Sequence, residues 1–507
     1  MFRLSSLCGV LTATLLCAQD PELRVSGGSL GGTIDLELEG SQFGQTGAIF
    51  LSLTPGPTPL ALLDPTDSRV LSVGLDLLGL TLIGPMLSPP VFAPPSFQVP
   101  NQPALVDGAL FFQGVTLFGP NGRLIDGVSL PRAVRFAPPN AFRDRFRTLT
   151  FPRSFFPVID GDDGRVLVVG GGQGALFAQI ATEKTEWFDP ISDGFSAGPD
   201  MTSPRSLHTA TELLDGRWLI VGGVDRSNDP VTAVEIFDPS TRTFTAVASM
   251  ALQRMGHTAT RLPDGRVLVS GGMTDLNAPT TPIDPVYSIT RATEIYDPQT
   301  NTWSSGPQMR QPRAGHVAIP RADGRVLLAG GVSWFTFIVR LPSIENSTDL
   351  FDPTTNAIAA GPNLRQSRGL PSVVQISPGR WLLAGGVGTI SLTQWGTLTT
   401  AAEIYDEGSN SFTARAPMAQ ARGLHQAIDL GGGRFLQIGG GDGTLFAITP
   451  LATCEVYDVA ANTWSAGPSL NLARVAYGAY RTATGQLHVL GGDTPTGVDF
   501  STEFFYR

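Results

Sequence analysis

Seven arginines recur through this chain of 507 residues at intervals of roughly 50 residues, and an acidic residue follows each of them. The arginines are Arg153, Arg205, Arg254, Arg313, Arg368, Arg422 and Arg474. The acidic residues are Glu186, Glu235, Glu294, Asp349, Glu403, Glu455 and Glu503. A guanidinium and a carboxylate at fixed repeat positions favour a charge-assisted hydrogen bond. The pattern therefore predicts one buried or half-buried ion pair in each repeat.

Histidine occupies a second shared position in four of the repeats, three residues after the arginine. These residues are His208, His257, His316 and His425. The remaining copies have Phe156, Pro371 and Tyr477 at this position. A ring of histidines around a channel could ligate a metal ion. Because Phe, Pro and Tyr replace histidine in three copies, we expect these side chains to pack and to hydrogen-bond their neighbours instead.

Short β-strands and tight turns must position these residues, as the unit at residues 250–307 illustrates. Asp264-Gly265 favours the positive φ of a tight hairpin, and the apolar run that follows ends in Gly271-Gly272. Such a run predicts a strand covered on both faces, whose glycines allow neighbouring backbones to come close. Trp303 belongs to an outer strand, where we expect it to fill the gap between neighbouring units. The glycine pair occurs seven times in phase, beginning at Gly170, Gly222, Gly271, Gly330, Gly385, Gly439 and Gly491.

This period, the double glycine, the acidic residue before aromatic-Asp-Pro and the aromatic residue after Asn-Thr resemble the kelch repeat, whose copies form the blades of a β-propeller. The resemblance extends from about residue 140 to the end of the chain and points to the galactose oxidase and kelch-like superfamily. It implies an all-β fold with a seven-bladed kelch propeller over residues 139–507. It also implies that repeat arginines can reach the open face and bind acidic groups of a partner. The predicted binding residues therefore include Arg205, Arg254, Arg313 and Arg422.

The seventh copy ends before a fourth strand can form, because the sequence stops at Arg507. A ring with an open seam would expose an unpaired strand edge. Asn140-Ala141-Phe142 resembles the Asn-Thr-Trp of an outer strand and lies shortly before Arg153. We therefore predict that residues from about 140 to 149 pair with the C-terminal strand and close the ring.

The first 138 residues contain no copy of the repeat. Residues 1–18 combine Arg3, an apolar run and a small residue before a polar pair, which is typical of a secretory signal peptide. Residues 19–138 contain alternating apolar and polar positions, as at 33–39, and predict a small antiparallel β-sandwich. This part loosely resembles a β-sandwich module that precedes other domains in secreted bacterial proteins. Prolines at 88–103 exclude a central strand, so we expect an extended loop there.

Charge and composition limit the classes of partner. The formal net charge of −10 argues against nucleic acid or an anionic membrane, since both favour basic patches. No apolar run is long enough for a transmembrane helix. Once Cys8 and Cys17 leave with the signal peptide, Cys454 remains alone and no intrachain disulfide can form. We therefore expect a secreted or cell-surface protein that is a monomer.

The segments between the second and third strands vary most and share one face of a propeller, where binding residues usually lie. Aromatic side chains beside acidic and basic ones suit carbohydrate or peptide recognition. The predicted binding residues in these loops are Asp225, Tyr287, Trp334, Trp395, Phe446 and Asp493. We therefore expect a binding or adhesion module for a carbohydrate or a protein.

A sugar-modifying enzyme is the alternative. Kelch mutarotases that act on acidic sugars require only Arg, His and Glu around the channel, which this chain has. The galactose oxidase resemblance implies a copper site with two Tyr, two His and a Cys linked to one of the tyrosines. Here Cys454 adjoins Glu455 and the histidines occupy packing positions. The sequence therefore favours binding, and we predict no catalytic residue, no metal site and no cofactor.

Overall fold

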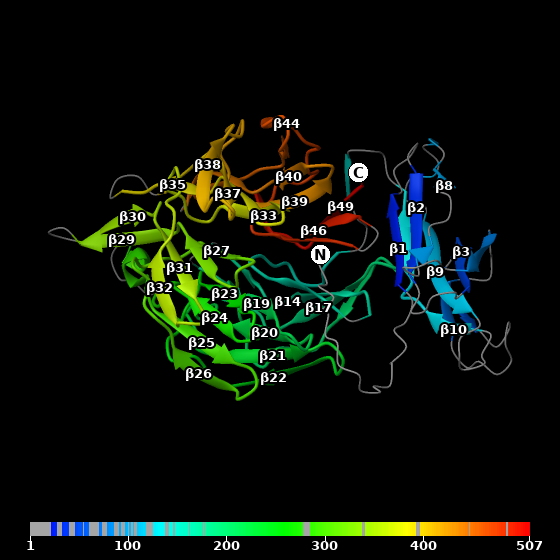
Figure 1. Cartoon of the computed structure of the whole chain (residues 1–507), viewed down its shortest axis with the longest axis horizontal. Coiled ribbons are helices and arrows are strands. Elements are labelled where there is room, and N and C mark those ends of the chain that lie inside the picture. The colour runs from blue at the N-terminus through cyan, green and yellow to red at the C-terminus, as the bar shows by residue number, and fades with distance from the viewer. Residues whose placement is uncertain are drawn as a thin grey trace. The chain divides into compact units, whose positions relative to one another are not determined.

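The structure is a computed structural model in which two compact units are described. The first unit comprises Met1–Gly27, Gly31–Pro100 and Gly108–Arg135, and the second contains Phe136–Arg507 (Figure 1). The predicted signal peptide, residues 1–18, lies outside the described residues. The described residues are 22–27, 33–39, 46–53, 55–59, 70–73, 79–85, 91–92, 97–99, 101–102, 105, 109–117, 125–136, 141–144, 148–161, 163–174, 176, 178–276, 284–336, 340–391, 396–445, 447–482 and 485–506.

Two antiparallel sheets and a short ribbon make up the first unit. One sheet contains β1 (Glu22–Gly27), β2 (Thr33–Glu39), β7 (Val91–Phe92) and β8 (Phe97–Gln98). The other contains β3 (Thr46–Ser52), β6 (Gly79–Pro85), β9 (Ala109–Leu117), β10 (Ile125–Val128) and β11 (Arg132–Arg135). The ribbon pairs β4 (Pro55–Pro59) with β5 (Val70–Val73).

The alternation expected at 33–39 brings the apolar side chains of β2 onto one buried face. Ile34, Leu36 and Leu38 are each at most 4% exposed. Leu38 lies directly over Gly114 of β9, so the two sheets pack against each other at this point.

The prediction of an extended loop at 88–103 was partly wrong. This segment contains β7 and β8, two short segments that pair with opposite ends of β2. Pro89-Pro90 and Pro94-Pro95 precede these segments instead of interrupting them, so the paired residues keep their N–H groups.

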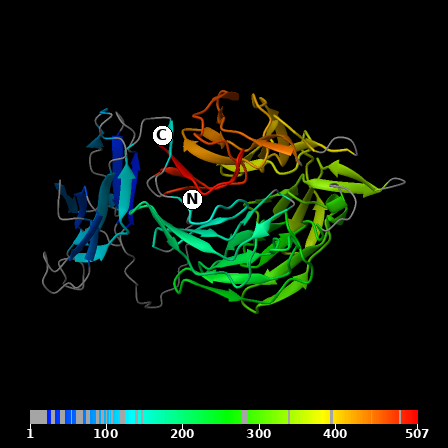
Figure 2. The same ribbon diagram turned by 180° about the vertical axis from the view of Figure 1, so that it is seen from behind.

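Among the described residues of the second unit, seven four-stranded antiparallel sheets are arranged as the blades of a β-propeller (Figures 1 and 2). In four neighbouring pairs of blades the first strands contact each other, and residues of the first strands line a common central cavity, so these strands lie innermost. From inner to outer strand, the blades are β13 (Val158–Asp160), β14 (Val166–Val169), β17 (Thr185–Asp189) and β18 (Gly194–Ala197); β19 (Thr209–Glu212), β20 (Trp218–Val221), β21 (Val234–Asp238) and β22 (Thr243–Ala246); β23 (Thr258–Arg261), β24 (Val267–Ser270), β25 (Thr293–Asp297) and β26 (Thr302–Ser305); β27 (Val317–Pro320), β28 (Val326–Ala329), β31 (Thr348–Asp352) and β32 (Ala357–Ala360); β33 (Ser372–Ser377), β34 (Arg380–Ala384), β37 (Ala402–Asp406) and β38 (Ser411–Arg415); β39 (Gln426–Gly431), β40 (Arg434–Ile438), β43 (Glu455–Asp458) and β44 (Thr463–Ala466); β45 (Gly478–Arg481), β46 (Leu487–Leu490), β49 (Thr502–Tyr506) and β12 (Ala141–Asp144).

The glycine pairs follow the second strand of each blade and do not lie within it. Gly222 and Gly223 directly follow β20, with φ of 60° and 90°. A Cβ on Gly222 would lie 2.6 Å from the carbonyl oxygen of Arg254, at the entrance of the next blade. The predicted reason for the glycines, close approach of neighbouring backbones, is therefore confirmed, and a left-handed turn is added to it.

Outer-strand aromatic residues close the gaps between blades, as predicted for Trp303. Its ring centroid lies 5.0 Å from that of Tyr296 on the same blade. Its indole N–H donates to the carbonyl oxygen of Ala248 in the preceding blade, at 2.7 Å. Trp464 makes the equivalent bond to Ala416 at 2.6 Å.

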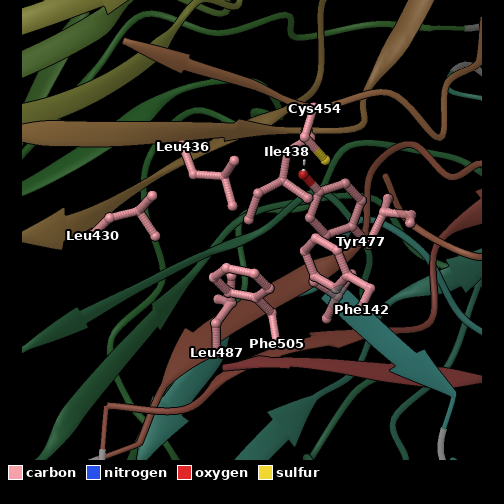
Figure 3. Packing of buried hydrophobic residues seen from close by; sticks show 10 residues of the cluster. Phe142, Leu430, Leu436, Ile438, Cys454, Tyr477, Leu487 and Phe505 are labelled. Atoms are coloured by element: carbon pink, nitrogen blue, oxygen red, sulfur yellow. Dashed lines mark hydrogen bonds between the residues drawn. The ribbon is translucent and has the colours of Figure 1, made fainter. Parts of the chain in front are cut away.

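The last blade takes its outer strand from residues upstream of the first repeat. β12 pairs with β49 in antiparallel register, from Ala141 opposite Tyr506 to Asp144 opposite Glu503. Phe142 is 4% exposed, and its ring centroid lies 5.2 Å from that of Phe505. Figure 3 shows both rings in a cluster with Leu487 and Tyr477.

Additional short elements lie between the second and third strands of the blades. They are β15 (Gly172–Gln173) and β16 (Ile180–Ala181); the 3₁₀ helix η3 (Asp284–Ser288); β29 (Val332–Thr336) and β30 (Arg340–Ile344); β35 (Val387–Thr389) and β36 (Thr397–Leu398); β41 (Gly441–Thr444) and β42 (Ala447–Pro450); and β47 (Asp493–Thr494) and β48 (Gly497–Val498). We call the propeller face that carries these segments the loop face. No helix among the described residues has the length and apolar character needed to cross a membrane.

Truncation of Phe142 tests how far β12 stabilises the second unit. Phe142→Ala leaves a cavity against Phe505, so we expect the free energy of unfolding to fall by about 3–5 kcal/mol. Urea denaturation of the full chain measures this change. Ile180→Ala is the control, because Ile180 is 65% exposed and its loss leaves no buried cavity. Equal stability of the two variants would contradict closure by β12.

Candidate binding face

Each repeat arginine lies in the segment that leads into the first strand of its blade, and Arg254 is representative. Its Nη2 donates to Glu294 Oε1 at 2.6 Å, and its Nη1 donates to the carbonyl oxygens of Gly271 (2.8 Å) and Ala292 (3.1 Å). Glu294 also accepts the backbone N–H of Ala251 at 2.7 Å. One ion pair therefore joins the glycine turn, the third strand and the incoming segment.

The predicted ion pair is confirmed in all seven repeats. The nitrogen–oxygen distances, in chain order from Arg153–Glu186 to Arg474–Glu503, are 2.6, 2.6, 2.6, 3.2, 2.6, 2.9 and 2.8 Å. Every arginine side chain is at most 1% exposed. Burial lowers the pKa of Arg254, and the charge of Glu294 opposes this effect.

The fourth blade has an aspartate where the others have glutamate, and its pair differs in geometry. Asp349 accepts from Arg313 Nε at 3.2 Å, while Arg313 Nη2 donates to Ser347 Oγ at 2.9 Å. The hydroxyl of Ser347 donates in turn to Glu345 at 2.7 Å. A serine and a second carboxylate therefore complete the contacts that the shorter side chain does not make. Burial raises the pKa of Asp349.

The expectation that Arg205, Arg254, Arg313 and Arg422 contact a ligand is not met by their positions. Each of these side chains is 0% exposed, and each guanidinium donates to backbone carbonyls and to its paired acid. A partner could reach them only after the ion pair had opened. These arginines therefore hold the blades together.

The histidines pack on the glycine turn of the preceding blade. A Cβ on Gly222 would lie 2.8 Å from Cε1 of His257, so the ring occupies space that the glycine leaves. His257 Nε2 is hydrogen-bonded to Thr209 Oγ1 at 3.1 Å, and His316 Nε2 to Ser270 Oγ at 2.9 Å. Burial lowers the pKa of both rings to about 3, so both are neutral at pH 7. Packing with hydrogen bonds, the predicted role, is confirmed for these two.

A central cavity of about 550 Å³ lies along the inner strands. It is lined by His208, His257 and His316 together with Tyr477, threonines and apolar residues. The Tyr477 hydroxyl donates to the carbonyl oxygen of Ile438 at 2.7 Å. The described residues contain no group of three or more His, Cys, Asp or Glu side chains arranged to hold a metal ion.

Cys454 and Tyr477, two residue types of the copper-site alternative, lie in the hydrophobic cluster of Figure 3. Cys454 is 3% exposed, and burial raises the pKa of its thiol to about 11. Burial also raises the pKa of Tyr477. Both groups are therefore held protonated within the packing between the last two blades.

Two acidic residues predicted to bind instead organise their own loops. Asp225 Oδ1 accepts the backbone N–H groups of Ser227 at 2.8 Å and of Asp229 at 3.1 Å. The backbone of Asp493 pairs with that of Val475, and burial raises the pKa of its carboxyl. Their carboxylates are half-buried at the loop face.

Tyr287 and Trp334 lie close together in the loops of the third and fourth blades. Trp334 donates its indole N–H to the carbonyl oxygen of Ile289 at 3.0 Å, and the guanidinium of Arg340 lies 4.6 Å from its ring centre. Both aromatic rings pack against a buried cluster that includes Val286 and Met273. Trp395 and Phe446, also predicted to bind, lie outside the described residues.

Beside Trp334 the loop face has a groove of about 500 Å³, which we call the Trp334 groove. It is lined by Ile289, Thr290, Arg291, Ala292, Gln308, Gln311, Pro312, Trp334, Phe335 and Thr336. Arg291, Gln308 and Gln311 are exposed, and in the described part of the chain their side chains have no hydrogen-bond or ion-pair partner. Phe335 is 46% exposed. The groove therefore offers a free cation, two free amides and an aromatic ring.

Sequence reasoning did not assign Arg291, Gln308 and Gln311 to a site. They lie within the repeating unit, with Arg291 three residues before the acid Glu294 and Gln311 two residues before Arg313. No feature of the sequence distinguishes them as binding residues. The groove forms where β29 of the fourth blade approaches residues 308–314, which connect the third blade to the fourth. The sequence does not reveal this approach.

A family model and two solved structures resemble this chain. The Kelch motif matches residues 205–251, 256–310 and 432–471. A fungal alcohol oxidase of the AA5 family, in complex with copper, aligns with a TM-score of 0.56 and 19% identity over 73% of this chain and 77% of its own. At this identity the likeness shows the fold alone. YjhT aligns with a TM-score of 0.42 and 14% identity over 70% of this chain and 95% of YjhT. No curated protein sequence matches the chain significantly.

Neutralising one buried acid tests the structural role of the ion pairs. In Glu294→Gln the charge of Arg254 stays buried without its partner, so we expect the free energy of unfolding to fall by about 3–5 kcal/mol. Asp215→Asn is the matched control, since Asp215 pairs with Arg217 at the surface and such pairs contribute at most about 1 kcal/mol. Urea unfolding compares the two, and similar losses would contradict the assigned role.

The buried histidines make stability depend on pH. Burial lowers the pKa of His208 well below 6.5, so below pH 6.5 the unfolded chain binds a proton that the folded chain does not. Stability therefore falls with decreasing pH, by up to about 1.4 kcal/mol per pH unit for one such ring. His208→Phe, which copies Phe156 of the first blade, should show a smaller loss between pH 7 and pH 5 in urea unfolding. Identical pH slopes would contradict this assignment.

Proposed function

We propose that this chain, a kelch-repeat β-propeller, is a binding module that recognises a protein or a carbohydrate through its loop face. We further propose that it acts outside the cell or at the cell surface. The signal-like residues 1–18 support that location.

The Trp334 groove carries this proposal. Its volume lies in the range of ligand sites, about 300–1,000 Å³, and its free side chains are hydrogen-bond donors and acceptors beside an exposed ring. Trp334 and Ile289 are fixed by their mutual hydrogen bond, so the walls of the groove are already positioned before a ligand binds.

The pairing of the repeat arginines favours binding over sugar modification. A mutarotase-like site needs Arg, His and Glu side chains that converge on a substrate. Here all seven arginines form ion pairs with their own acids, and His257 and His316 are hydrogen-bonded to hydroxyl groups. His208 lines the central cavity with both ring nitrogens unpaired, but no arginine or carboxylate is among the described residues that line it. The exposed cation and amides lie in the Trp334 groove.

A screen of the purified full chain against peptide and glycan arrays tests this proposal. We expect a ligand whose affinity falls at least about tenfold in Phe335→Ala, because the ring is a contact surface of the groove. Phe500→Ala is the matched control, since Phe500 is 47% exposed and lies outside the groove. Absence of any ligand, or equal affinity of both variants, would contradict binding at this groove.

A further inference from the structure

The wall of the Trp334 groove formed by β29 is a strand edge. β29 and β30 form a two-stranded sheet. On the side away from β30, the N–H and C=O of Val332 bond to the backbone of Ala314, at 2.8 and 3.0 Å. Beyond this bridge β29 continues through Trp334 to Thr336 along the groove.

The edge beyond Val332 presents backbone groups to the groove. Because N–H and C=O groups alternate between the two sides of a strand, those of Trp334 and Thr336 point the same way as those of Val332. Trp334 lies opposite Pro342, which has no N–H to share with it, as this alternation requires. In the described structure no backbone partner bonds to Trp334 or Thr336 on this side. Two residues spaced about 7 Å apart therefore offer the pattern that an added strand would use.

The side chains around this edge favour a peptide over a sugar. A sugar ring usually stacks on a flat aromatic face, but Arg340 covers one face of Trp334 and the indole also packs against a buried cluster. Gln308 and Gln311 line the same groove as the edge strand, and their amides match the N–H and C=O groups of a peptide backbone. Phe335 adds an exposed apolar contact.

Arg291 favours a ligand that carries a negative charge. Its guanidinium is exposed at the groove and has no acidic partner within the described residues. In a chain with a net charge of −10, this free cation is positioned to pair with a carboxylate of the ligand.

We propose that the Trp334 groove binds an extended segment of a partner protein, which adds to the open edge of β29 as a further strand and places a carboxylate beside Arg291. Backbone hydrogen bonds to Trp334 and Thr336 position the segment, and the carboxylate selects it. This inference rests on the proposed binding function and names its ligand class.

A displayed library of random heptapeptides, selected on the full chain and counter-selected on Phe335→Ala, is the probe. We expect the selected peptides to contain Asp or Glu, and synthetic copies to bind Arg291→Gln about tenfold more weakly. Replacing the acidic residue by its amide should remove this difference between the two proteins. Selected peptides without an acidic residue, or with equal affinity for Arg291→Gln, would overturn the charge assignment.

Strand addition is tested on the backbone itself. Thr336→Pro removes an edge N–H, whereas Thr336→Val keeps it, so only the proline variant should lose affinity, by about tenfold. Thermal unfolding of both variants checks that the propeller is intact.

Peptides methylated on alternate backbone nitrogens supply a second test that leaves the protein unchanged. One methylation register should abolish binding and the other should preserve it, and equal binding of both would overturn strand addition.

The glycan array separates the two proposals. Glycan binding that depends on Phe335, with no selected peptide, would overturn the strand-addition inference and leave the binding function in place. A chain that selects no peptide and retains no glycan would overturn both.

Discussion

The buried ion pair between a repeat arginine and its acid is the interaction on which the propeller depends. Two opposite charges removed from water are tolerated only when their remaining hydrogen-bonding capacity is also satisfied. In the third blade Arg254 donates to two backbone carbonyls, and Glu294 accepts two backbone N–H groups. The pair therefore fixes segments with no regular backbone pairing of their own. An ion pair at the equivalent position of each blade ties its incoming segment to the third strand of that blade.

Residues that hold the blades together recur in each repeat, whereas the residues with free hydrogen-bonding groups at the loop face differ from blade to blade. The arginines, glycines and outer aromatic residues each contact a neighbouring strand or blade, so their types recur with the repeat. By contrast, the residue types of Arg291, Gln308 and Phe335 do not recur at the equivalent positions of the other blades. A propeller built in this way can change its loops without disturbing the blades, which is how a common scaffold acquires a particular ligand.

The periodic part of the molecule was predictable from sequence and the groove was not. Arg254 and Glu294 recur in phase with equivalent residues, so their pairing follows from the repeat alone. Whether Arg205, Arg254, Arg313 and Arg422 could also reach a ligand did not follow from the repeat, because the depth of a side chain depends on how neighbouring blades meet. Trp334 was identified as a loop aromatic residue, but its covered face depends on Arg340, across a hairpin. The strands at Val91–Phe92 and Phe97–Gln98 were missed because the prolines before each of them were taken to exclude a strand.

Arginine-selective chemical modification of the native full chain, mapped by mass spectrometry, tests the central claim most directly. We expect Arg291 to react readily with phenylglyoxal, while the seven repeat arginines react only after denaturation, because their guanidinium groups are buried in ion pairs. Rapid modification of Arg254 or its equivalents in the folded protein would contradict the account. It would return these arginines to the accessible binding surface.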